Sequence, residues 1–205
     1  AGLPWEMGLT EAHQVLAMNN LRGRVTLRTD GGLRTGRDIV MAAMMGAEEY
    51  GIGTAALIAM GCIMVRQCQS NTCPVGVCTQ NQELRDKFTG SADKVVNLIT
   101  FYAQEVREIL ASIGARSLSD VIGRADLLSQ VSRGADNLDD LDLNPLLIKV
   151  DGSNKLVYDR SKTRTEVPDT LDAEIVSDAA RFLNDGEKMQ LSYAVQNTHR
   201  TVGTR

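Results

Sequence analysis

Two short strand-like runs, each followed by glycines and then by a helix-like run, constrain the fold of this chain more than any other feature. The first unit covers residues 25–45 and the second covers residues 49–60. Strands and helices that alternate in this way build α/β folds, so the sequence predicts that class. The expected elements are a strand over Val25–Thr29, a helix over Gly36–Met45, a strand over Glu49–Gly51 and a helix over Ala55–Met60.

The rest of the chain is predicted to be mostly helical. Apolar residues recur at helical spacing from Ser91 until Gly114 ends the run, and the spacing of Thr35 and Asp38, like that of Ser117 and Asp120, is that of a capping box. The aspartate-rich stretch after Gly134 is expected to be a solvated linker or loop. The remaining expected elements are a helix over Leu9–Leu21 capped by Thr10, a short helix over Ser117–Ile122, a helix over Leu171–Leu183 and a strand over Lys188–Val195.

The glycines between strand and helix are candidates for binding a phosphate. Glycine lets backbone N–H groups approach an anion closely, and the N-terminus of a helix adds unpaired donors. The segments are Asp30-Gly31-Gly32-Leu33-Arg34-Thr35-Gly36 and Gly51-Ile52-Gly53-Thr54. Two such loops on successive strand–helix units match the phosphate site of many TIM barrels, although either loop alone is equally well explained as a tight turn.

Composition excludes several classes of protein. The net charge is −4 with acids and bases interspersed, so there is no basic stripe for nucleic acid. Apolar runs stay shorter than the roughly 18 residues that span a membrane. The N-terminal stretch lacks the features of a secretory signal peptide, so we expect a reducing, cytoplasmic environment.

All four cysteines lie within one stretch of the chain, GCIMVRQCQSNTCPVGVC. Disulfides are disfavoured in a reducing compartment, and zinc sites usually contain C-x2-C pairs, which this stretch lacks. Iron–sulfur clusters tolerate varied spacing, and Pro74 after Cys73 is similar to the Cys-Pro of bacterial ferredoxins. Spacing leaves a cluster and unliganded thiols both open, and it does not choose between three and four irons.

Long strings of the chain resemble the large (α) subunit of glutamate synthase. They are GLPWEMGLTEAHQVL, LRTDGGLRTGRDIVMAAMMGAEEYGIGTAALIAMGCIMVRQC, SNTCPVGVC, SADKVVNL, VREILASIGARSLSDVIGR, DLDLNP and EVPDTLDAEIV. The resemblance covers essentially the whole chain. Because that family's subunit is several times longer and begins with a catalytic cysteine, whereas this chain begins with Ala1, we expect a segment without glutaminase activity.

The resemblance implies the C-terminal part of a (β/α)8 TIM barrel, namely its last two strand–helix units. A cysteine-rich cluster loop, helices and the start of a C-terminal β-helix domain would follow. The implied divisions are residues 1–62 for the end of the FMN-binding barrel, 62–90 for the cluster loop, 91–133 for helices that close the barrel domain, 134–168 for a linker and 169–205 for the start of the β-helix domain.

The resemblance also implies cofactors and their residues. In the family, glutamine-derived ammonia combines with 2-oxoglutarate, FMN reduces the product to glutamate, and electrons reach FMN through a 3Fe-4S cluster. The cluster ligands would be Cys62, Cys68 and Cys73, with Cys78 left out. The residues expected at the flavin phosphate and ribityl chain are Asp30, Gly31, Gly32, Gly51, Gly53 and Thr54. No catalytic residue is expected in this segment, since those that contact 2-oxoglutarate and the flavin ring lie upstream.

The implied partners are the rest of the large subunit and an electron donor. The donor is either a small NADPH-oxidising flavoprotein subunit carrying FAD, as in the bacterial type that the sequence favours, or ferredoxin. We expect no nucleic acid and no membrane among its partners. The alternative is an inactive or cluster-only electron-transfer fragment that binds no flavin by itself.

Overall fold

The computed structural model describes residues 2–135, 140–150, 156–161, 170–199 and 202–203. They form two compact units, 1–161 and 162–205, which are described separately. The helices of the first unit are α1 (Trp5–Met18), α2 (Gly36–Met44), α3 (Thr54–Ala59), α4 (Gln82–Arg85) and α5 (Ala92–Ser112), with 3-10 turns at Arg22–Arg24, Cys68–Ser70, Leu118–Val121, Ala125–Leu127 and Asn144–Leu147. The strands are β1 (Arg28–Asp30) and β2 (Glu49–Gly51).

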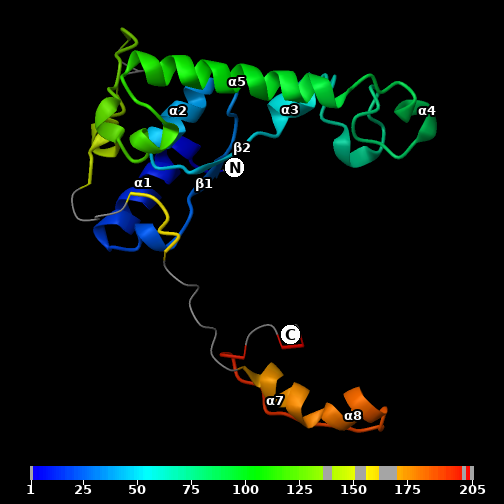
Figure 1. The fold of residues 1–205 in the computed structure, drawn as a ribbon. Coiled ribbons are helices and arrows are strands. Elements are labelled where there is room, and N and C mark those ends of the chain that lie inside the picture. The colour runs from blue at the N-terminus through cyan, green and yellow to red at the C-terminus, as the bar shows by residue number, and fades with distance from the viewer. Residues whose placement is uncertain (1, 136–139, 151–155, 162–169, 200–201, 204–205) are drawn as a thin grey trace. The chain divides into compact units, whose positions relative to one another are not determined.

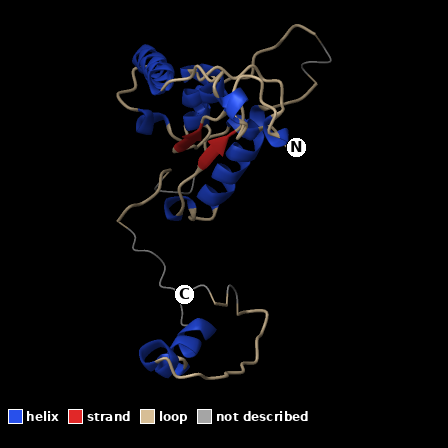
Figure 2. Cartoon of the chain, turned by 90° about the vertical axis from the view of Figure 1, so that its right-hand side faces the viewer, coloured by secondary structure: helices blue, strands red, loops and turns tan. Residues whose placement is uncertain are grey.

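The two strands pair in parallel, with Arg28 opposite Glu49 and Asp30 opposite Gly51. Figure 2 shows this pair as the two adjacent arrows, with helices around them. A parallel pair joined through a helix is the arrangement that the two strand–helix units predicted, so the α/β prediction is confirmed at this level. Among the described residues, the elements other than this strand pair are helices and 3-10 turns.

Helix α2 lies at the centre of the first unit, so it is buried on two sides. One side joins α5 and the 3-10 turn after it in a cluster that contains Val40, Met44, Leu110 and Val121. The other side faces α1, with Leu9, Ala42 and Met45 in a second cluster. In Figure 1, α5 lies along α2 and α3, which it contacts. Burying one such aliphatic side chain contributes about 1.5–3 kcal/mol.

Both predicted capping boxes are present. The Thr35 hydroxyl accepts the N–H of Asp38, and the Asp38 carboxylate accepts the N–H of Thr35. Ser117 and Asp120 form the same reciprocal pair at the 3-10 turn. Each box pairs two backbone N–H groups that would otherwise have no partner at the start of a helix. The spacing of the two residues therefore predicts where the helix begins.

Three predictions in the first 30 residues need correction. Helix α1 begins at Trp5, one turn earlier than expected, and ends at Met18. Thr10 is therefore no cap: it is buried inside the helix, and its hydroxyl donates to the Glu6 carbonyl at 2.7 Å. The first strand begins at Arg28 instead of Val25, since the Val25 carbonyl accepts from the Arg22 side chain.

The second unit contains α7 (Leu171–Asp178) and α8 (Ala180–Asp185). They replace the single helix expected over Leu171–Leu183, because Ala179 departs from helical geometry between them. The strand expected over Lys188–Val195 is wrong: these residues form neither strand nor helix. A strand needs a neighbour to pair its backbone, and the described residues of this unit supply none. The expected linker lies partly outside the described residues.

A buried polar cluster connects α1 to the start of β2. Arg22 is fully buried, and its guanidinium pairs with Glu48 while donating to His13 Nδ1 at 3.1 Å and to the Gly46 carbonyl at 3.0 Å. Burial, and secondarily the charge of Arg22, lowers the pKa of His13 to about 4. His13 is thus neutral at pH 7 and accepts an internal hydrogen bond from Arg22.

None of the helices in the described ranges has the length and apolarity needed to cross a membrane.

Candidate functional site

The two glycine loops leave the carboxyl ends of adjacent strands. Because Asp30 is the register partner of Gly51, the loops after β1 and β2 begin side by side. A Cβ on Gly51 would lie 2.6 Å from the Asp30 carboxylate oxygen Oδ2, so the Asp30 side chain covers Gly51 directly. The structure therefore brings together Asp30 and Gly51 of the predicted site, and it requires glycine at position 51.

The N-terminus of α2 differs from the expectation of a free anion site. The Asp38 carboxylate accepts the N–H groups of Arg34 and Thr35, and the Glu105 carboxylate of α5 accepts the N–H of Gly36 at 2.6 Å. These donors are already paired with carboxylates, which also neutralise the positive end of the helix dipole. An anion at the first loop therefore cannot use the N–H groups of Arg34, Thr35 or Gly36 without displacing these carboxylates. Sequence reasoning missed Glu105, since it lies 69 residues further along the chain.

The rest of the two loops is open. Helix α3 starts after Gly53 without a side-chain cap, and a Cβ at Gly53 would meet nothing within 4 Å. In the first loop Gly32 is equally uncrowded, and its φ of +87° suits glycine. An open pocket of about 530 Å³ is lined by Leu3, Pro4, Trp5, Glu6, Asp30, Gly31, Gly32 and Arg34. Trp5, at the start of α1, thus lines the space beside the first loop.

The cysteine stretch follows α3 directly. The Cys62 N–H donates to the Leu57 carbonyl at 3.0 Å, which fixes Cys62 to the end of that helix. Cys62 and Cys78 are half-buried, Cys68 is exposed and Cys73 is buried, and all four are free thiols. Among the described residues, no group of three or more His, Cys, Asp or Glu side chains is arranged to hold a metal ion.

The surroundings of one of the four thiols nevertheless favour its deprotonated form, the thiolate. Backbone N–H groups of residues 75–78, chiefly those of Cys78 and Val75, lower the pKa of Cys73. By contrast burial, followed by the neighbouring Cys68, raises the pKa of Cys78. Thiolates are the form of cysteine that binds iron, so the chemistry of this set fits an iron–sulfur cluster with Cys73 among its ligands.

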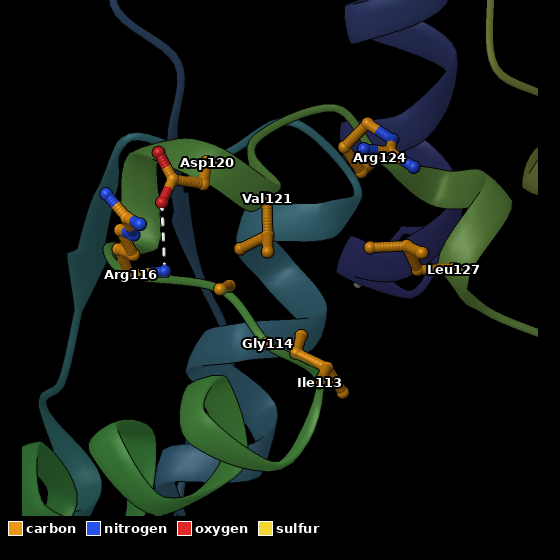
Figure 3. Close-up of a pocket in the computed structure, with 8 residues that line it drawn as sticks. Ile113, Gly114, Arg116, Asp120, Val121, Arg124 and Leu127 are labelled. Atoms are coloured by element: carbon orange, nitrogen blue, oxygen red, sulfur yellow. Dashed lines mark hydrogen bonds between the residues drawn. The ribbon is translucent and has the colours of Figure 1, made fainter.

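A separate pocket lies at the C-terminal end of α5 (Figure 3). It has a volume of about 410 Å³. Its polar groups pair with one another or with neighbours: the Asp120 carboxylate accepts the N–H of Arg116, drawn as a dashed line, and Arg124 pairs with Asp126. With these groups already paired, this pocket is a weaker candidate than the loops beside β1 and β2.

Comparison with known proteins identifies the family. A profile described as "Conserved region in glutamate synthase" matches residues 1–116. The chain is 69% identical over 205 residues to the NADPH glutamate synthase large chain of Azospirillum brasilense, and 45% identical over 206 residues to that of Bacillus subtilis. It is 47% identical over 208 residues to the ferredoxin-dependent glutamate synthase of Pyropia yezoensis. These alignments cover 99–100% of this chain but only 13–14% of each relative, so the chain spans about a seventh of their length.

Proposed function

The chain belongs to the glutamate synthase family, and from that membership we propose that it ends the FMN-binding barrel of a large chain and carries its cluster loop. The reaction of the whole protein would be the reductive transfer of glutamine-derived ammonia to 2-oxoglutarate, giving glutamate. When bound, FMN supplies hydride transfer and a 3Fe-4S cluster supplies single electrons. The residues of this segment hold and orient these groups in the cytoplasm, and none of them is assigned a catalytic role.

The adjacency of the second glycine loop and Cys62 is the observation that carries this proposal. Only α3 separates Gly53 from the cysteine stretch, and a helix of six residues is roughly 9 Å long. A flavin phosphate at the loop and a cluster held by Cys62, Cys68 and Cys73 would therefore lie close enough for electron transfer. Cys78 stays outside the proposed ligand set.

The proposed roles at the flavin site follow from the charge and the hydrogen-bonding groups of each residue. The glycines at positions 31, 32 and 53, with Thr54 after them, offer backbone N–H groups to the phosphate. Gly51, which the Asp30 carboxylate covers, is assigned with Asp30 to the ribityl chain. Asp30 suits the ribityl hydroxyls, because its carboxylate accepts hydrogen bonds and would repel a phosphate. Arg34, which lines the same pocket as Gly31 and Gly32, supplies a cation for the phosphate.

NADPH, through a flavoprotein subunit carrying FAD, is the electron donor that we propose. The 69% identical relative is an NADPH enzyme, whereas the ferredoxin-dependent relative is 47% identical. The remaining large chain and this donor are the proposed partners.

The cluster assignment is tested by two serine variants of the full-length large chain. We expect Cys68→Ser to lose iron, acid-labile sulfide and the three-iron EPR signal, because serine removes one thiolate ligand. Cys78→Ser should keep all three. Cys68 is exposed, so its replacement leaves the packing intact. A Cys68→Ser protein with full iron content, or a wild-type protein that binds FMN but no iron, would contradict the assignment.

The flavin site is tested by Gly53→Ala. A methyl group at this position meets no protein atom within 4 Å, so the flavin-free protein should fold and unfold as the wild type does. The same methyl group would occupy the space proposed for the phosphate, and we expect FMN to bind about tenfold more weakly or worse. Flavin-fluorescence titration of the deflavinated full-length protein measures this.

Gly8→Ala is the matched control for that measurement. Gly8 lies within α1 and is equally uncrowded, and it does not line the pocket beside the first glycine loop. Its variant should bind FMN with wild-type affinity. Equal affinity of the Gly53→Ala and Gly8→Ala proteins would exclude the second loop from the phosphate site.

A further inference from the structure

The cysteine stretch contains an unusual concentration of left-handed backbone. In the described parts of the chain, four residues other than glycine have positive φ, and three of them fall between Cys62 and Cys73: Met64, Arg66 and Asn71. Side chains disfavour this conformation, and such residues persist only where the surrounding structure holds them. Asparagine tolerates it best, because its short side chain makes local hydrogen bonds.

The contacts of Asn71 close the loop that contains Cys73 and Cys78. Its side-chain oxygen Oδ1 accepts the N–H of Gln80 at 2.6 Å. The Thr79 hydroxyl lies 2.8 Å from the Asn71 carbonyl oxygen and 3.0 Å from Oδ1, so its single proton is shared between them. One residue in a left-handed conformation thus joins the two ends of a ten-residue loop, residues 71–80.

The same hydrogen bonds continue into α4. The Thr79 hydroxyl accepts the N–H of Asn81, and the Asn81 side chain accepts the N–H of Leu84, which caps α4. Helix α4 in turn presses on the turn between Cys73 and Cys78: a Cβ on Gly76 would lie 2.5 Å from the Leu84 carbonyl oxygen. The loop is therefore fixed at its ends by Asn71 and at its centre by α4.

We propose that Asn71 is the positioning residue that keeps the loop of residues 71–80 closed and so holds Cys73 in place as a ligand of the iron–sulfur cluster. Closure holds Cys73 in its buried position while Cys68, three residues before Asn71, remains exposed. Opening of the loop would displace the Cys73 thiolate from the iron, so Asn71 controls how long the cluster is retained. This inference rests on the proposed function, because it takes the loop to be the cluster loop.

Two substitutions at position 71 separate the hydrogen bonds from the backbone conformation. Asn71→Gly adopts the left-handed conformation easily but removes Oδ1. Asn71→Asp keeps an oxygen acceptor on a side chain that tolerates this conformation. In the full-length protein, we expect Asn71→Gly to release iron to a ferrous chelator about tenfold faster than the wild type, since two hydrogen-bond contacts are lost. Asn71→Asp should stay within about twofold.

Asn20→Gly is the control, because Asn20 is also left-handed, at φ +56°, but lies at the end of α1, far along the chain from the cysteines. It should release iron at the wild-type rate, and all three variants should begin with the wild-type EPR signal. Equal release rates for Asn71→Gly and Asn20→Gly would overturn the role of Asn71. A wild-type protein without iron would instead overturn the proposed function, and this inference with it.

Discussion

Replacement of Arg22 by methionine is expected to destabilise the region from α1 to β2 by about 3–5 kcal/mol. The guanidinium is fully buried and pairs with Glu48, whose side chain is only 15% exposed. Methionine fills much of the space but leaves this carboxylate without its cation. It also leaves the ring nitrogen of His13 and the carbonyl of Gly46 without a donor.

Hydrogen–deuterium exchange in the full-length protein measures this effect locally, since a multidomain chain has no single unfolding free energy. Peptides from residues 5–51 should exchange more than about a hundredfold faster in Arg22→Met. Arg28→Met is the matched control, because Arg28 also pairs with a glutamate, Glu49, yet its side chain is 71% exposed. The control should change stability by less than about 1 kcal/mol. Similar exchange in the two variants would show that the buried pair is not important for stability.

Gly46→Ala is expected to cost about 2–5 kcal/mol, combining about 1–2 kcal/mol of backbone strain with about 1–3 kcal/mol of overpacking. Gly46 has a φ of +114°, and a Cβ there would lie 2.4 Å from the imidazole ring of His13. That ring cannot easily withdraw, because Nδ1, one of the two ring atoms nearest to this Cβ, also accepts the hydrogen bond of the buried Arg22. Soluble yield and exchange of the same peptides report the loss.

Gly114→Ala is the control for this crowding. Gly114 also has a positive φ, +74°, but a Cβ there meets nothing within 4 Å. Only the strain of about 1–2 kcal/mol should remain. If both variants lost the same stability, contact with His13 would not be the cause. Because Gly46 and Arg22 share His13, the effects of Gly46→Ala and Arg22→Met should not add.

Local signals predicted the elements that depend on neighbours within four residues. The two capping boxes are confirmed, since each is formed by residues close in sequence. The strand Glu49–Gly51 is also confirmed, because Arg28–Asp30 is present to pair with it. The strand expected over Lys188–Val195 is wrong, because alternation predicts a strand only where such a partner is present.

The candidate site likewise combines features that the sequence predicts with features that only the packing of distant segments decides. The glycines, the cysteines and their order along the chain were readable from the sequence, and so was the family that they resemble. The closure of the α2 N-terminus by Glu105 was not readable, because it depends on where α5 packs. The proposed role of Asn71 was not predicted either, because it depends on hydrogen bonds to Thr79 and Gln80 that form only when the loop folds.

The sequence by itself determined the family, the α/β order and the residues that we propose to bind a phosphate or iron, because these depend on residue type and spacing. Only the tertiary structure decided which helix starts have no side-chain cap, as at α3, and which backbone donors are already paired, as at Gly36. It also decided that Arg22 lies in the interior with Glu48. Burial and hydrogen-bond pairing depend on every segment that packs at a point, and these segments come from distant parts of the chain.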